Sequence, residues 1–197
     1  MQQSRPRGRP RDPAVESRVH DAVLEVYWET GWAGFTLEAV ARRAGVGREA
    51  LYRRWNSKGE LLAAALQARG PLPEPIDTGS VHGDLVELAR QLLDGYAGPA
   101  GLVTLRATLE ARVHPDLLAR LADALNASRL LMARDIVTRA VSRGELPATT
   151  PVTMLLELVS GAVLSHVLFA PVGARPEPDP GYAERLVSLV LSALAAG

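Results

Sequence analysis

Residues 35–55 read FTLEAVARRAGVGREALYRRW. Thr36 is a favourable N-cap for a helix over residues 37–44, and Gly45 suits the left-handed residue that commonly ends one. The turn Gly45-Val46-Gly47 follows, and a second short helix is predicted over residues 48–55. Two short helices joined by a glycine-containing turn have the spacing of a helix-turn-helix.

Apolar side chains of this stretch are spaced so that the two helices can close a small shared core. They are Leu37, Val40, Ala41, Val46, Leu51 and Trp55. This spacing leaves Arg48, Glu49, Tyr52 and Arg53 on the outward side of the second helix. In a DNA-binding helix-turn-helix the second helix enters the major groove while the first crosses the phosphate backbone.

Helix is the predicted structure of the whole chain, because no run of alternating β-branched residues is bounded by turn signals. Asp12-Pro13 starts the first helix, which Gly31 is expected to end. Ser57 and Glu60 have capping-box spacing and open a helix that runs to about Arg69. Further helices are expected at about 80–96, 99–113, 116–143, 151–170 and 180–195.

A proline-rich break at residues 70–75 is the expected domain boundary. We expect a flexible basic arm over residues 1–12, a helix-turn-helix domain over 13–69 and a helical ligand-binding and dimerisation domain over 76–197. The predicted fold is all-α, with about nine helices.

The composition is that of a globular protein, with 47% hydrophobic and 22% charged residues. The net charge of zero conceals an asymmetry, since residues 1–58 hold 11 basic and 7 acidic side chains. One explanation of this excess of basic residues is chance together with a basic N-terminal tail. The other is that the region binds an acidic partner such as nucleic acid. The absence of cysteine excludes disulfides, thiolate metal sites and a thiol nucleophile. Residues 1–18 lack the apolar stretch of a signal peptide, so a cytoplasmic location is expected.

The spacing F-T-x-x-x-V-A-x-x-A-G-V-x-x-x-x-L-Y-x-x-W-x-S-K-x-x-L, from Phe35 to Leu61, resembles that of the tetracycline-repressor (TetR) family of bacterial regulators. The resemblance implies a transcriptional repressor that binds a palindromic double-stranded DNA operator as a homodimer. It also implies release by a small-molecule effector, which the sequence does not identify, and association with the nucleoid when bound to DNA. No cofactor is expected.

Family resemblance also implies roles for individual residues. Thr36, Tyr52 and Lys58 align with residues that hold phosphates, and Lys58 lies beside the Ser57 cap, where backbone N–H groups favour an anion. The family's base readers align with Arg48, Glu49, Ala50 and Arg53. Arginine can pair with guanine, glutamate can accept from cytosine, and alanine can touch a thymine methyl.

Two residues depart from the family pattern. Gly47 stands where a Ser or Thr cap is common, which weakens the start of the recognition helix and removes a hydroxyl contact. Arg54 and Trp55 replace a commoner His or Tyr followed by Phe. Arg54 either adds a phosphate contact or is a solvated surface arginine.

The expected arm contains Pro6-Arg7-Gly8-Arg9-Pro10, which resembles the core of an AT-hook. Arg7 and Arg9 would then lie in a narrow minor groove, where the negative potential is concentrated. The alternative is an unstructured electrostatic arm without base preference. Both interpretations predict higher DNA affinity and stronger salt dependence.

Residues 151–172 are almost continuously apolar. Their length would permit a membrane span, but Glu157 near the middle and the bracketing prolines argue against one. A helix apolar on nearly all sides is otherwise buried on two faces, against its own domain and a second subunit. The predicted dimer residues, on this segment and the last helix, are Leu158, Gly161, Ala162, Ser165, Leu186, Val190 and Leu194. A monomer with an internal core is the alternative.

An effector pocket has a weaker signature in this sequence. Candidate lining residues are Tyr96, Arg106, Glu110, Met132, Glu157 and His166. Each could equally be a surface charge, a core residue or a dimer contact. The four histidines have no second ligand at metal-binding spacing, and no catalytic serine or phosphate-loop motif occurs, so neither a metal site nor an enzyme is expected.

A second hypothesis is a dimeric module that binds a small molecule or a protein and carries a vestigial helix-turn-helix. Gly47 is the feature that favours it, since it weakens the recognition helix.

Overall fold

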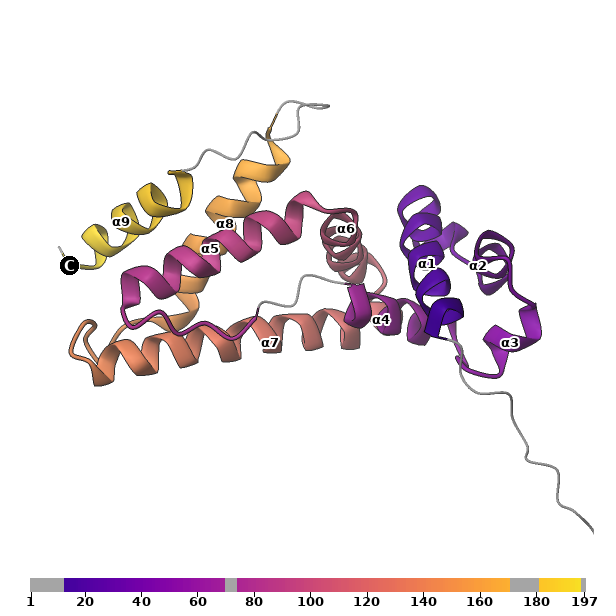
Figure 1. The fold of residues 1–197 in the computed structure, drawn as a ribbon, viewed down its shortest axis with the longest axis horizontal. Coiled ribbons are helices and arrows are strands. Elements are labelled where there is room, and N and C mark those ends of the chain that lie inside the picture. Colours follow the sequence, from indigo (N-terminus) through magenta and orange to yellow (C-terminus); the bar gives the residue numbers. More distant parts are fainter. Residues whose placement is uncertain (1–12, 70–73, 171–180, 196–197) are drawn as a thin grey trace, which may run out of the picture. The chain divides into compact units, whose positions relative to one another are not determined.

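A computed structural model describes residues 13–69, 74–170 and 181–195 (Figure 1). All regular structure within these ranges is α-helical, which confirms the predicted fold class. The chain divides into two compact units, Met1–Ala68 and Arg69–Gly197. Arg7, Arg9 and the expected cap Asp12 lie outside the described residues.

From residue 13 onward, the N-terminal unit contains four helices: α1 (Pro13–Gly34), α2 (Leu37–Ala44), α3 (Arg48–Tyr52) and α4 (Lys58–Arg69). The expected end of the first helix at Gly31 coincides with a break in α1, and a further helical turn follows it. Gly31 breaks the helical path with φ 62° and ψ −175°, a conformation that favours glycine, and helical turns resume as far as Gly34.

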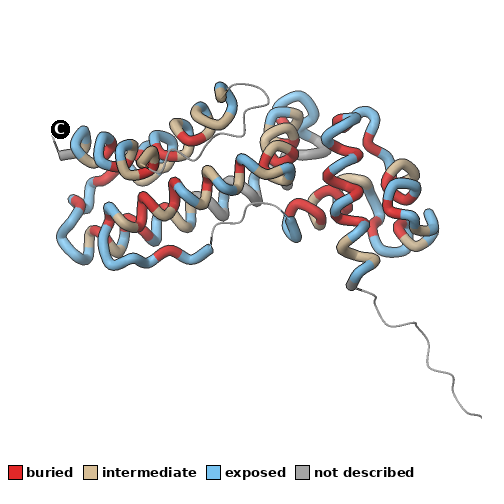
Figure 2. Tube along the Cα trace, turned by 45° about the horizontal axis from the view of Figure 1, so that its top comes forward, coloured by how far each residue is buried: buried red, intermediate tan, exposed pale blue. Residues whose placement is uncertain are grey.

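The core of this unit is built from the inner face of α1 and the chain that follows it (Figure 2). Tyr27 and Phe35 are fully buried and meet edge to face, with ring centroids 5.5 Å apart. Trp32 lies against Phe35 at 6.4 Å. The predicted shared core is largely confirmed, because Leu37, Val40, Ala41, Leu51 and Trp55 are buried, but Val46 is only half-buried.

An ion-pair network joins α2 to α1 on the outside of this core. Arg43 of α2 donates through Nη1 to Glu25 at 2.9 Å and through Nη2 to Glu29 at 2.6 Å. Both carboxylates lie one turn apart on α1, at the i and i+4 spacing that places them on one face. A single guanidinium therefore links α2 to two successive turns of α1 at the surface.

The C-terminal unit contains five helices in its described part: α5 (Val81–Ala97), α6 (Pro99–Val113), α7 (Pro115–Ser142), α8 (Val152–Leu168) and α9 (Tyr182–Ala195). Helix α5 contacts α7, α8 and α9, and Figure 1 shows α8 crossing behind α5. Leu85, Leu92, Ile136, Val159 and Val187 are buried in the shared core. No helix in the described part of the chain has the length and apolarity that crossing a membrane requires.

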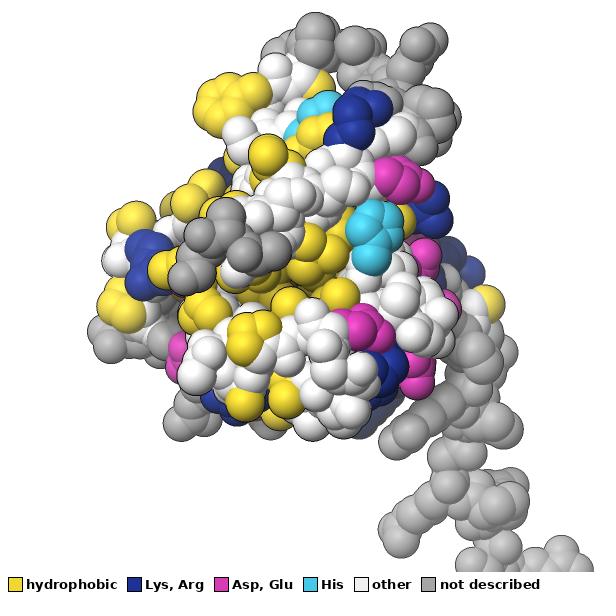
Figure 3. Space-filling view, turned by 90° about the vertical axis from the view of Figure 1, so that its left-hand side faces the viewer, with side chains coloured by type: hydrophobic (Ala, Val, Ile, Leu, Met, Phe, Trp, Pro, Cys, Tyr) yellow, Lys and Arg dark blue, Asp and Glu magenta, His cyan; other side chains and the backbone are white. Residues whose placement is uncertain are grey.

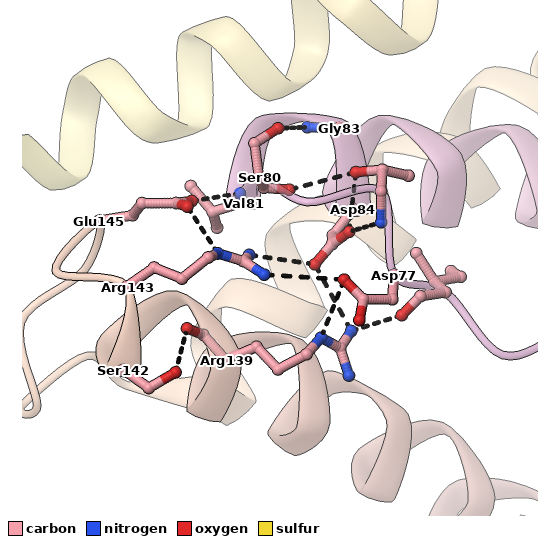
Figure 4. A network of polar contacts seen from close by, with 11 residues as sticks. Asp77, Ser80, Val81, Gly83, Asp84, Arg139, Ser142, Arg143 and Glu145 are labelled. Carbon is pink, nitrogen blue, oxygen red and sulfur yellow. Dashed lines mark hydrogen bonds and ion pairs between the residues drawn. The ribbon is translucent and has the colours of Figure 1, made fainter.

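Asp84 anchors a polar network where the chain enters α5 (Figure 4). Its fully buried carboxylate accepts hydrogen bonds from the Thr78 backbone N–H at 2.6 Å and the Thr78 hydroxyl at 2.8 Å. Arg139 of α7 and Arg143, which caps the C-terminus of α7, reach its other oxygen at 3.4 and 3.3 Å. Burial raises the pKa of Asp84, but these donors outweigh it, so the pKa lies below its ordinary value.

The same arginines fasten other parts of the entry segment. Arg139 also donates to the Ile76 carbonyl, and Arg143 donates to Glu145 at 2.6 Å. Glu145 accepts in turn from the Val81 backbone N–H, in the first turn of α5. The end of α7 thus holds the segment from Ile76 to Asp84 by charge-assisted hydrogen bonds.

Replacing Asp84 with Asn is expected to lower the free energy of unfolding by about 3 kcal/mol, because two arginines lose their buried counter-ion. Urea denaturation followed by circular dichroism measures this. The difference from wild type should shrink as the pH falls below about 4, since a depressed folded pKa contributes stability only while the carboxylate is charged. Asp77→Asn is the matched control. Its exposed carboxylate lies 3.7 Å from both arginines, and its loss should cost less than about 1 kcal/mol.

Candidate nucleic-acid interface

The turn between α2 and α3 depends on Gly45, which adopts the left-handed conformation with φ 66° and ψ 36°. Its N–H bonds back to α2, and the Val46 N–H donates to the Ala41 carbonyl at 3.0 Å. At the other end of α2 the Thr36 hydroxyl accepts from the Ala39 N–H at 3.1 Å, as its predicted capping role requires. Both ends of α2 are therefore closed locally.

The recognition helix α3 is shorter than predicted, ending at Tyr52 rather than at residue 55. Beyond Tyr52 the chain tightens into turns, with the N–H groups of Arg54 and Trp55 both donating to the Leu51 carbonyl at 2.9 Å. Gly47 precedes the helix and offers no side-chain cap. This arrangement buries Leu51 and Trp55 in the core.

The outward side of α3 carries the residues predicted to face DNA. Arg48, Glu49, Tyr52 and Arg53 are exposed, whereas Ala50 is half-buried. The structure thus brings the predicted base readers onto one short surface.

Glu38, in the first turn of α2, joins two of these exposed residues. Its Oε1 accepts a hydrogen bond from the Tyr52 hydroxyl at 2.7 Å and lies 3.4 Å from Arg48 Nη2. The hydrogen bond from Tyr52, followed by one from its own backbone, lowers the pKa of Glu38. The same hydrogen bond raises the pKa of Tyr52.

Lys58 is the first residue of α4, and its side chain is half-buried against Trp32. Its Nζ donates to the Trp32 carbonyl at 2.7 Å and lies 4.2 Å from the centroid of the Trp32 ring. The predicted capping box at Ser57 is present, because Ser57 accepts from the Glu60 N–H at 3.1 Å. Glu60 completes it one residue earlier than expected, accepting from the Asn56 N–H at 2.9 Å.

Arg54 is tied to the body of the N-terminal unit. It pairs with Glu16 of α1 at 2.8 Å and lies over the Trp55 ring at 4.9 Å. These contacts hold the turn after α3 against α1. Arg54 also borders an open cavity of about 640 Å³, whose lining residues are Glu16, His20, Arg53, Arg54, Trp55, Ala64, Gln67 and Ala68.

In the C-terminal unit, the predicted dimer residues of α8 lie on its outer face. Leu158, Gly161 and Ser165 are exposed and Ala162 is half-buried. On α9, by contrast, Val190 belongs to the unit's own core, and Leu186 and Leu194 are partly buried against that core. Figure 3 shows hydrophobic side chains gathered on one half of the face at this end of the unit, with charged ones mostly on the other half.

The predicted effector residues occupy different environments. Tyr96 is buried in the core and Met132 packs against it. Arg106 and Glu110 pair with each other along α6 at 3.1 Å. The ring of His166 stacks on Tyr182 at 4.0 Å, whereas Glu157 is exposed on the outer face of α8.

Comparison with known proteins assigns both units. Residues 20–65 match the bacterial regulatory proteins of the tetR family, and residues 75–190 match the tetracyclin repressor-like C-terminal domain. The transcriptional regulator AqdR of Rhodococcus erythropolis is 32% identical over 187 residues, 94% of this chain and 88% of that protein. The chain belongs to the TetR family.

Other TetR-family proteins agree with this assignment. The DNA-binding transcriptional repressor TetR of Mycobacteroides abscessus is 30% identical over 158 residues, covering 74% of this chain and 77% of its own. Among solved structures, the repressor MexZ of Pseudomonas aeruginosa shares the fold, with a TM-score of 0.70 at 22% identity over 93% of this chain and 96% of its own. FadR of Bacillus subtilis, solved with stearoyl-CoA, has a TM-score of 0.68 at 19% identity over 92% of this chain and 98% of its own. The chain is a helix-turn-helix transcriptional regulator.

Sequence reasoning missed the internal partners of this TetR-family surface. Glu38, the Trp32 carbonyl and Glu16 hold Tyr52, Lys58 and Arg54 respectively. Glu38 carried a usable signal, because it follows the Thr36 cap by two residues and so lies at the end of α2 expected to face the phosphates. The other two partners are distant in sequence and carried none.

Replacing Gly47 with Ser is expected to stabilise α3 and tighten DNA binding, because Ser supplies the missing cap and a hydroxyl. Gly47 has an ordinary extended conformation, φ −68° and ψ 137°, and an added Cβ meets nothing within 4 Å. The gain in unfolding free energy should be about 0.5–1 kcal/mol, measured by thermal unfolding. Gly45→Ser is the control and should lose about 1 kcal/mol, because its φ of 66° is unfavourable for serine. A loss of stability in both variants would contradict this account of the α3 cap.

Proposed function

We propose that this chain is a sequence-specific repressor that binds a palindromic operator as a homodimer and is released by a small molecule. The observation that carries the proposal is the outward face of α3. It exposes Arg48, Glu49, Tyr52 and Arg53, while Leu51 and Trp55 anchor the helix from behind. A recognition helix requires such a pair of faces, one polar and exposed to the groove and one apolar and packed on the domain.

The described surface of the N-terminal unit also supports contact with a nucleic-acid backbone. Thr36 lies at the N-terminus of α2 and Lys58 at that of α4, and the N–H groups at a helix N-terminus favour a phosphate. Tyr52 ends α3 with an exposed hydroxyl side chain. We assign phosphate contacts to these three residues and base contacts to the exposed positions of α3, with Ala50 beside them.

The outer face of α8 supports assembly of two copies. Met154, Leu158, Gly161, Ser165 and Leu168 are all exposed, and their spacings alternate between four and three residues. Such alternation places them along one stripe of a helix, with small residues in the middle that allow close approach. A two-fold dimer would match a palindromic site whose half-sites lie about 34–36 Å apart.

An effector is assigned to the C-terminal unit on family membership. Of the predicted pocket residues, Tyr96 and Met132 belong to the core cluster and Arg106 pairs with Glu110. Release requires that the effector bind more tightly to a conformation with low operator affinity. We place the regulator in the cytoplasm, on the nucleoid when DNA-bound.

The direct test is fluorescence-anisotropy binding to DNA that flanks the chain's own gene, against a scrambled fragment, at two salt concentrations. A preference of about 10³ or more is expected of a specific regulator. Equal, salt-sensitive binding to both fragments would favour the alternative of a binding module with a vestigial helix-turn-helix.

Two substitutions separate base contacts from phosphate contacts. Arg53→Ala is expected to lose about 1–3 kcal/mol of operator binding and to relax base preference. Lys58→Ala should weaken binding to all sequences and reduce the salt slope by about 1. Anisotropy titrations over a salt series measure both, and equal losses on every sequence from the two variants would contradict these roles.

Replacing Leu158 with Glu is expected to produce a monomer with weakened operator binding, because each copy would place a charge on the apolar stripe of α8. Size-exclusion chromatography with light scattering measures the mass. Leu131→Glu is the matched control, since Leu131 of α7 is 58% exposed and lies outside α8 and α9. A dimer that persists in Leu158→Glu would refute the interface.

A further inference from the structure

We propose that Glu38 is an internal competitor of DNA, a carboxylate that occupies in the free protein the position a phosphate oxygen takes in the complex. The inference rests on the proposed DNA-binding function. It predicts a gain of affinity when a group in contact with the recognition helix is removed.

A single oxygen atom of Glu38 carries the argument. Its Oε1 lies 2.7 Å from the Tyr52 hydroxyl and 3.4 Å from Nη2 of Arg48. The Arg48 guanidinium also lies 5.8 Å from the centroid of the Tyr52 ring, so the three side chains form one cluster. The Glu38 oxygen accepts from the Tyr52 hydroxyl as the phosphate oxygen assigned to Tyr52 would, and the same oxygen also holds Arg48, which is assigned to a base.

The cluster lies at the ends of the elements assigned to DNA. Glu38 follows the Thr36 cap by two residues, and Arg48 and Tyr52 are the first and last residues of α3. All three side chains are at least two-fifths exposed, at 41% for Glu38, 64% for Arg48 and 47% for Tyr52. Solvent can therefore reach the cluster, and an approaching strand can exchange with the carboxylate without unfolding either helix.

Two effects of Glu38 oppose DNA binding. Arg48 and Tyr52 must give up a charged partner before they contact DNA, which subtracts from the free energy of association. The freed carboxylate then stays near the phosphates as a like charge. Neither effect depends on base sequence, so Glu38 should lower affinity for operator and unrelated DNA alike.

The test compares wild type with Glu38→Gln on operator and scrambled DNA at low and at physiological salt. Glutamine keeps an acceptor for the Tyr52 hydroxyl but removes the charge. We expect about threefold to tenfold tighter binding to both DNAs at low salt, with a smaller gain at physiological salt. Glu25→Gln is the matched control, because Glu25 is an exposed carboxylate of the same unit that pairs with Arg43 instead. It should change affinity less than twofold.

A second variant tests whether the gain in DNA affinity depends on the contact between Glu38 and Tyr52. In a Tyr52→Phe background, which lacks the hydroxyl, Glu38→Gln should produce a smaller gain than in wild type. An equal gain in both backgrounds would show a general charge effect and overturn the competitor role.

Other outcomes also decide against the inference. If Glu38→Gln weakens binding to both DNAs and lowers the melting temperature of the protein, the role of Glu38 is to stabilise the packing of α2 against α3. If the substitution weakens binding to the operator alone, Glu38 contacts a base. If wild type itself shows no preference for operator, the proposed function fails instead, and that result is visible before any variant is compared.

Discussion

The burial of one face of α1 is the constraint on which the whole N-terminal unit depends. Isolated helices shorter than about 12–15 residues are marginal in water, and α2 and α3 have only 8 and 5 residues. They persist because Tyr27 and Phe35 close a core onto which Leu51 and Trp55 also fold. The position of the outward residues of α3 is therefore determined by the apolar contacts that its opposite side makes with the core.

The charged groups of the same unit follow a second rule. Tyr52 and Lys58, predicted to contact phosphates, and Arg54, for which a phosphate contact was one of two alternatives, already have partners within the protein: a carboxylate, a carbonyl and another carboxylate respectively. Association with DNA is then an exchange of partners, and only the difference between the two sets contributes to affinity. In the C-terminal unit the corresponding charges are structural. The two arginines around Asp84 share its buried carboxylate and stabilise the fold.

Much of this architecture could be predicted from the sequence, because it depends on local chemistry. The caps at Thr36 and Ser57 and the left-handed turn at Gly45 are each encoded within four residues, and all three are present. Helix ends were less accurate where hydrogen bonding changes gradually, as after Tyr52, or where a break is followed by more helix, as after Gly31.

Contacts between distant residues lay beyond the sequence. The spacing that put Val190 on an apolar stripe of α9 could not show which side of that stripe faces the chain's own core. Likewise, the carbonyl of Trp32 lies 26 residues from Lys58, and no pattern in either segment points to the other. Such pairs are set by how the helices pack, which local spacing does not encode.

Lys58 has a further consequence, since it is the only lysine among the 197 residues and cysteine is absent. Apart from the α-amino group, amine-directed chemistry meets a single side chain, and that side chain lies over the Trp32 ring at the start of α4. Among side chains, acetylation or an amine-directed fluorescent label would therefore modify Lys58 alone and would cancel the only ammonium charge on the predicted DNA surface. The quenching of such a fluorophore by the adjacent indole would then follow the departure of this side chain from tryptophan in real time.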